Sequence, residues 1–254
     1  MKQIPNLFTL LNLFFGCIAI VFALQSGINI VYTTEGEQFI KLTENICYAS
    51  LFIGLAAVID FLDGFVARLL KATSTIGKEL DSLADVVSFG VAPGVILYQL
   101  LRMAFIRENE GLEASSAWLL PAFIFTCAGA YRLARFNVSE SKSNSFIGVP
   151  IPAAGLMVAS LPLIQFYTTS DFVYDLLSNK NLLYAIIFLL SYLMVSKFKM
   201  IALKFKDVSI KNNLPVIILL VIAVISAVFL HWIAVPIVFV AYIILSLINK
   251  NKLT

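Results

Sequence analysis

Long apolar runs follow one another along the whole chain, with short polar segments between them. Each run is close to the roughly 20 residues that a helix needs to cross a hydrocarbon core of about 30 Å. The runs predict eight spanning helices, over residues 6–26, 46–71, 79–101, 117–137, 150–168, 182–197, 214–231 and 233–249. We therefore expect an all-α, polytopic membrane protein, with residues 1–254 forming one integral membrane domain.

The composition agrees with this pattern. Of the 254 residues, 60% are hydrophobic and 13% are charged, against about 25% charged in an average soluble protein. The first run also resembles a signal peptide, because Lys2 precedes it. It is longer than the 7–15 apolar residues of a signal-peptide core, so we interpret it as the first span.

Basic residues predict the orientation, because they are retained on the cytoplasmic side of a membrane. With both termini inside, 14 of the 18 Lys and Arg residues are cytoplasmic, and the other four are Lys41, Arg102, Arg107 and Lys180. We expect an inner (cytoplasmic) membrane protein with its active site on the cytoplasmic side. The net charge of +3 then reflects topology and attraction to anionic lipid, not nucleic-acid binding.

Four aspartates interrupt the apolar pattern in the segment DFLDGFVARLLKATSTIGKELDSLAD, residues 60–85. At 3.6 residues per turn, one face of the second span carries Asp60, Asp63, Gly64 and Ala67. One face of the third span carries Gly77, Asp81 and Asp85. A connection of about six residues favours antiparallel neighbours, so we expect the four carboxylates to converge in one cavity.

Carboxylates inside a membrane need a compensating partner, since one charge at a helix centre costs roughly 2.5–3.5 kcal/mol. Pairing with Arg68, Lys71 or Lys78 is one explanation. Clustered oxygen ligands also suit hard divalent cations, and two such ions can hold a diphosphate during a displacement at phosphorus. The small residues Gly64 and Ala67 would leave room for that group. A divalent cation transporter would use intramembrane carboxylates as well.

The pattern Asp60-x-x-Asp63-Gly64-x-x-Ala67-Arg68, eight residues, Gly77-x-x-x-Asp81-x-x-x-Asp85 resembles the complete signature of the CDP-alcohol phosphatidyltransferases. The resemblance implies a helical bundle, generally homodimeric, that transfers a phosphatidyl group from a CDP-linked lipid to an alcohol and releases CMP. It implies two divalent ions, Mg²⁺ or Mn²⁺ with Ca²⁺ also able to bind, on Asp60, Asp63, Asp81 and Asp85. Asp85 would also be the general base. The nucleotide would lie against Asp60, Gly64, Ala67, Arg68, Gly77 and Asp81.

Three further segments, IPNLFTLLNLFFGCIAI, YRLARFNV and FIGVPIPAAG, are together similar to the phosphatidylserine synthases of this family. The resemblance covers most of residues 4–155 and implies CDP-diacylglycerol and L-serine as substrates. We expect a catalytic core over about 4–197, followed by an extra helix pair over about 214–249. Glycerol phosphate, inositol phosphate or an archaeal-type lipid remain alternative substrates.

Three basic residues are candidates for binding the acceptor: Arg132, Arg135 and Lys142. Two guanidiniums can bind a carboxylate or phosphate bidentately, although both arginines would also suit a plain interfacial role. The loop that carries Lys142 either closes over the acceptor or is an ordinary solvated turn. The polar residues Asn6, Thr9 and Asn12 of the first span either line the cavity or pack the helix. We expect a kink at Pro93 and Gly94.

Overall fold

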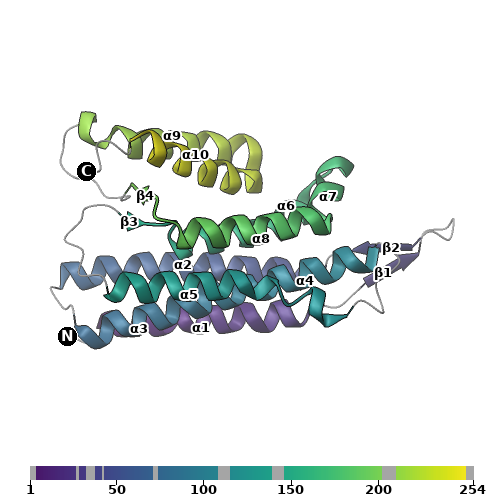
Figure 1. The fold of residues 1–254 in the computed structure, drawn as a ribbon, viewed down its shortest axis with the longest axis horizontal. Helices are drawn as coiled ribbons and strands as arrows, with labels where there is room; N and C mark the ends of the chain where they lie inside the picture. Colours follow the sequence, from purple (N-terminus) through teal and green to yellow (C-terminus); the bar gives the residue numbers. More distant parts are fainter. Residues whose placement is uncertain are drawn as a thin grey trace.

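The computed structural model describes residues 4–26, 29–32, 38–41, 43–70, 74–107, 115–138, 146–201 and 210–249. Its long helices lie side by side in one bundle, which confirms the predicted all-α membrane fold (Figure 1). Every one of the eight predicted segments contains a helix. The α-helices are α1 (Ile4–Leu24), α2 (Glu44–Leu69), α3 (Thr75–Asp85), α4 (Ala92–Arg107), α5 (Ala122–Val138), α6 (Ile151–Tyr167), α7 (Asp171–Leu177), α8 (Lys180–Val195), α9 (Ile210–Leu230) and α10 (Ala234–Ile248).

Several of these helices are long and apolar enough to cross a membrane. Four described stretches meet that criterion: Pro5–Leu24, Glu44–Leu69, Thr75–Arg107 and Asn213–Ile248. A fifth is added if α7 and α8, which meet at 61°, form one broken span. The chain is therefore a multi-pass membrane protein.

Two small antiparallel sheets, which the hydropathy pattern did not predict, lie toward opposite ends of the bundle (Figure 1). Strands β1 (Asn29–Tyr32) and β2 (Gln38–Lys41) pair with Asn29 opposite Lys41. Strands β3 (Phe146–Ile147) and β4 (Lys199–Met200) pair with Phe146 opposite Met200. The second sheet joins the segment before α6 to the segment after α8.

Helix α1 packs through a narrow seam of small and polar residues. Its buried positions alternate in steps of four and three, which is the spacing of a left-handed helix–helix seam: Pro5, Thr9, Asn12, Gly16, Ala19 and Ala23. Small residues let membrane helices approach closely. A Cβ on Gly16 would lie 2.3 Å from the Ser88 hydroxyl oxygen, so glycine is required there. The seam places the polar residues of α1 beside α2 and α3.

A π-helical turn, η1 (Val86–Val91), connects α3 to α4. We predicted a kink at Pro93 and Gly94, but the irregularity lies just before them, and they begin the regular helix α4. Thr126 of α5 donates a hydrogen bond to the Gly90 carbonyl at 2.8 Å. The wider turn thus begins directly after Asp85, as π-turns often do near functional groups.

The C-terminal helices α9 and α10 lie side by side (Figure 1). They are joined by the 3₁₀ turn η3 (His231–Ile233), where His231 has a φ of 50°. In this turn Trp232 stacks on Tyr167 of α6, with ring centroids 6.4 Å apart. Helix α10 also packs against α6 and β4, which attaches the pair to the rest of the bundle.

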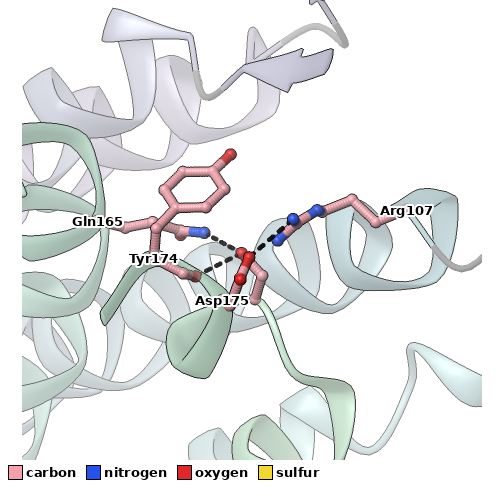
Figure 2. A network of polar contacts seen from close by, with 5 residues as sticks. Arg107, Gln165, Tyr174 and Asp175 are labelled. Atoms are coloured by element: carbon pink, nitrogen blue, oxygen red, sulfur yellow. Dashed lines mark hydrogen bonds and ion pairs between the residues drawn. The ribbon is translucent and has the colours of Figure 1, made fainter. Parts of the chain in front are cut away.

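A polar network joins α4, α6 and α7 at the end of the bundle that carries β1 and β2 (Figures 1 and 2). Arg107 forms an ion pair with Asp175 at 2.9 Å, and its guanidinium lies 5.1 Å from the centroid of the Tyr174 ring. Gln165 donates to the Ser178 hydroxyl at 2.7 Å. We call this the outer network, and the opposite end, which contains the aspartates, the inner end.

Candidate active site

Helices α2 and α3 bring the two aspartate stripes together at the inner end. Each of the two helices packs closely against α1. The first turn of α3 is fixed by Ser74, whose hydroxyl accepts a hydrogen bond from the Gly77 backbone N–H at 3.0 Å, as N-cap residues do. Helix α1 therefore acts as a common support for both carboxylate-bearing helices.

The carboxylates meet across the space between α2 and α3. Oxygens of Asp60, Asp63 and Asp81 all lie within 4.8 Å of one another. Asp85 lies next to Asp60 and interacts electrostatically with the other three carboxylates. Since two ionised carboxylates repel at such distances, this arrangement requires protons or cations between them. The predicted convergence of all four aspartates is present in the structure.

The site lies largely away from solvent. Asp63 is 7% exposed and Asp85 is 8% exposed, while Asp60 and Asp81 are half-buried. Thr9 of α1 donates a hydrogen bond to an Asp63 carboxylate oxygen at 2.8 Å. One oxygen of Asp85 is buried and has no hydrogen-bond partner. The protein therefore orients Asp63 and leaves Asp85 available to an incoming group.

No basic side chain in the described part of the chain forms an ion pair with this cluster. Among the described residues, the one ion pair is Arg107 with Asp175 at the outer network. Arg68 is exposed and interacts with Asp63 only at longer range. Lys71 lies outside the described residues. Ion pairs with the cations that the structure describes thus do not explain why the aspartates are buried.

The residues fit a divalent cation. Ligand oxygens about 2.0–2.6 Å from one ion lie no more than about 5 Å apart, and the three aspartates meet that limit. Carboxylates are the ligands that Mg²⁺, Mn²⁺ and Ca²⁺ prefer. Asp60, Asp63 and Asp81 could therefore hold a metal ion, and Asp85 lies beside them.

The small signature residues differ in their surroundings. Gly64 is half-buried, and a Cβ built on it would meet within 4 Å, among the described atoms, Arg68 Nη1 at 3.7 Å. Ala67, one turn further along α2, is also half-buried. Gly77 is crowded instead, because its Cβ would lie 2.9 Å from Asn6 Oδ1. Gly64 thus leaves open space beside the carboxylates, whereas Gly77 allows α3 to approach α1.

The two predicted acceptor arginines, both on α5, have different environments. Arg132 is 5% exposed, interacts electrostatically with Asp85, and has a buried Nε without a hydrogen-bond partner. Arg135 donates to the carbonyls of Val195 at 2.9 Å and Ser196 at 3.2 Å. Arg132 is therefore the buried arginine near Asp85, while Arg135 holds the end of α8. Lys142 lies outside the described residues.

Sequence reasoning missed several residues around the site. It left open whether Thr9 lines the cavity, and the structure places its hydroxyl on Asp63. Asn137 donates to the Ser82 hydroxyl at 2.8 Å, which joins α5 to α3 one residue after Asp81. The amide in the quoted segment YRLARFNV was a usable signal for Asn137.

Comparison with known proteins connects this geometry to a family. The chain is 36% identical over 222 residues to a CDP-diacylglycerol–serine O-phosphatidyltransferase of Helicobacter pylori, covering 86% of this chain and 78% of the relative. A Bacillus subtilis protein of the same name is 41% identical over 160 residues, 62% of this chain and 77% of the relative. A third, from Methanocaldococcus jannaschii, is 44% identical over 116 residues, 45% of this chain and 51% of the relative. A family profile described as CDP-alcohol phosphatidyltransferase matches residues 2–192, and the chain belongs to this family.

Proposed function

We propose that this protein transfers the phosphatidyl group of CDP-diacylglycerol to the hydroxyl of L-serine and releases CMP. One observation carries the proposal: four carboxylates converge at the inner end without an ion pair to any described cation, and the buried guanidinium of Arg132 lies near Asp85. The relatives named above support serine as the acceptor.

Asp85 is the proposed general base. One of its oxygens is buried without a partner, so it can accept the proton of the serine hydroxyl. The serine oxygen then bonds to the lipid-proximal phosphorus as the bond from this phosphorus to the CMP oxygen breaks. The proton stays on Asp85, and CMP leaves with the negative charge.

Asp60, Asp63 and Asp81, with Asp85 beside them, are the proposed ligands of two divalent ions, Mg²⁺ or Mn²⁺. Ions bound there would neutralise the diphosphate and stabilise the charge on the departing phosphate. The hydrogen bond from Thr9 to Asp63 orients that carboxylate, as second-shell partners do in metal sites. The open space above Gly64 would take the nucleotide, with Ala67 and Arg68 on the same side of α2.

Arg132 is the proposed partner of the serine carboxylate. It interacts electrostatically with Asp85, but no ion pair joins the two among the described residues. A small acceptor between them would present its hydroxyl to Asp85 and its carboxylate to Arg132. Arg135 would support this arrangement from the end of α8, and Lys142, in the segment before β3, remains a proposed contact of the acceptor.

Orientation, domain organisation and assembly are part of the proposal. We place the inner end on the cytoplasmic side of the inner membrane, because the basic residues are concentrated there in the sequence. Residues 4–197 would form the catalytic core, and a homodimer is expected from the family resemblance. In a variant without native cysteines, an impermeant thiol reagent should label intact cells at Lys180→Cys and not at Lys199→Cys. The reverse pattern would invert the orientation.

CMP release is the test of the function. Purified protein with CDP-diacylglycerol and Mn²⁺ should release CMP fastest with L-serine. Ethanolamine, which lacks the carboxylate, should be a poor acceptor. Faster release with glycerol 3-phosphate or inositol phosphate would mean that this compound, and not serine, is the acceptor. The transferase reaction itself would stand. No release with any acceptor, together with Mn²⁺ uptake into proteoliposomes, would support a cation transporter instead.

A further inference from the structure

Asn12 of α1 is a buried amide whose side-chain atoms have no hydrogen-bond partner in the described part of the chain. The residue is 0% exposed, and both Oδ1 and Nδ2 lack a partner there. Gln165 in the outer network differs, because its Nε2 donates to the Ser178 hydroxyl. A buried polar group without hydrogen bonds costs free energy. An apolar residue would therefore be more stable than Asn12 at this position, unless the amide has a bound partner.

Contacts with η1 place Asn12 close to Asp85. The Ser88 hydroxyl of η1 donates to the Asn12 backbone carbonyl at 3.0 Å, and Ser88 follows Asp85 by three residues. Three residues correspond to about 4.5 Å along a helix axis. A Cβ on Gly16, one turn further along α1, would lie 2.8 Å from Ser88 Cα. Helix α1 therefore packs directly on the backbone that follows Asp85.

The direction of the helices aims the amide back toward the carboxylates. The contact between Asn6 and Gly77 precedes the contact between Asn12 and Ser88 in both segments, so α1 runs parallel to α3 and η1. A side chain on a helix leans toward the N-terminus of that helix. The Asn12 side chain thus leans from the level of Ser88 toward the level of Asp85.

The polar groups on the two sides are complementary. Thr9, three residues before Asn12, already donates a hydrogen bond from α1 to Asp63. Asp85 has a buried oxygen, Oδ1, without a partner, and an amide nitrogen such as Asn12 Nδ2 is a donor. A water molecule that accepts from Asn12 Nδ2 and donates to Asp85 Oδ1 would give both atoms a partner.

We propose that Asn12 is a positioning residue for Asp85. Its amide donates to one ordered water, and this water donates to the buried Asp85 oxygen, which fixes the carboxylate for removal of the serine proton. A carboxylate oxygen has two lone pairs, so the oxygen that accepts from the water can also receive that proton. The inference rests on the proposed function, in which Asp85 is the general base.

The test compares Asn12→Leu with Gln99→Met. Leucine has nearly the shape of asparagine but no hydrogen-bonding atoms. Asn12→Leu should lower kcat for CMP release about 10-fold or more, as losses around a metal site do, with the KM for both substrates within about twofold of the wild type. Gln99 is the control, because it is also a buried amide facing α1, and it donates to the Ala23 carbonyl at 3.0 Å. Gln99→Met should keep the wild-type kcat.

Stability and double substitutions distinguish positioning from packing. The thermal midpoint of Asn12→Leu should equal or exceed that of the wild type, because an apolar group replaces a buried amide. Adding Asn12→Leu to Asp85→Asn should cause less than about a twofold further loss of activity, since residues that act through one contact are not additive. Adding it to Asp63→Asn should cause the full loss. Asn12→Ser, which keeps a donor, should retain more activity than Asn12→Leu.

The outcomes separate this inference from the proposed function. A wild-type kcat in Asn12→Leu would overturn the positioning role and leave the serine transferase intact. A lower thermal midpoint or a failure to fold would do the same, because the amide would then stabilise the fold. A rise in either KM without a fall in kcat would make Asn12 a substrate contact instead. A wild-type protein that releases no CMP with serine would refute the proposed function, and this inference with it.

Discussion

Charged side chains differ in burial and pairing between the inner end and the outer network of the bundle. In the outer network, Arg107 and Asp175 pair with each other and are 35% and 65% exposed. At the inner end, Asp85 and Arg132 are almost fully buried, and they are the two charged side chains among the described residues with buried, unpartnered atoms. Both buried amide atoms of Asn12 on α1 also lack partners.

This difference in pairing indicates that a ligand binds at the inner end. A buried charged group without a partner costs much free energy, so we expect a bound molecule to supply the partner at the inner end. The buried atom without a partner in the outer network, Gln165 Oε1, is uncharged. The outer ion pair is complete within the protein, so it needs nothing from a ligand. Substitutions should therefore affect catalysis at the inner end and have little effect at the outer network.

Removal of one site carboxylate should give the largest effect. Each of Asp60→Asn, Asp63→Asn, Asp81→Asn and Asp85→Asn should reduce the rate of CMP release by at least about 100-fold, because a metal ligand or the base is lost. Asp175→Asn in the outer network is the matched control and should stay within twofold. Near-normal activity of two or more folded site variants in saturating Mn²⁺ would remove the basis for a shared metal site.

Added bulk beside the carboxylates should have the next largest effect. Gly64→Leu would fill the open space above α2 and lower the affinity for CDP-diacylglycerol by about 10-fold or more, measured by binding to the purified protein. Gly54→Leu, on the same helix, is the control. An added Cβ on Gly54 has no described atom within 4 Å, and Gly54 lines an apolar cavity with Leu156 and Trp232. Equal affinity for CDP-diacylglycerol in the two variants would show that the nucleotide does not bind beside Gly64.

Loss of the Thr9 hydroxyl should have an intermediate effect. Thr9→Val keeps the shape of the side chain but removes the hydrogen bond to Asp63. Second-shell losses of this kind reduce metal affinity by about 10-fold or more, so the Mn²⁺ concentration for half-maximal activity should rise by that factor. Thr9→Ser keeps the hydroxyl and should restore the wild-type value. If the Mn²⁺ dependence of Thr9→Val is unchanged, Thr9 packs α1 but does not orient a metal ligand.

A substitution in the outer network should have the smallest effect on activity. Arg107→Ala removes a partly exposed ion pair, which contributes at most about 1 kcal/mol to stability. The thermal midpoint should fall slightly and the KM for serine should stay unchanged. A loss of activity as large as that of Asp60→Asn would mean that the two ends are coupled and that the contrast between them is wrong.

The sequence predicted the parts of this protein that depend on local pattern. Apolar runs located every long helix, because crossing a membrane requires a continuous stretch of that length. The spacing of Asp60, Asp63, Asp81 and Asp85 predicted their convergence, since helical periodicity fixes which residues share a face. Helix α7 (Asp171–Leu177) was missed because seven residues are too few for a span.

The local sequence pattern could not predict contacts between segments that are distant in the sequence. Asn137 of α5 lies 55 positions after its hydrogen-bond partner Ser82 of α3, so periodicity alone could not pair them. The π-turn before Ala92 depends on how α5 packs against Gly90 and Gly94. The different environments of Arg132 and Arg135 depend on where α8 ends.

Binding of Mn²⁺ to the purified protein, without lipid or serine, examines the aspartate site in isolation. Electron paramagnetic resonance distinguishes free from bound Mn²⁺. The wild type and Asp175→Asn should bind Mn²⁺ alike, and Asp60→Asn and Asp81→Asn should lose most of this binding. Equal binding by all four proteins, or none by the wild type, would contradict a metal site on α2 and α3.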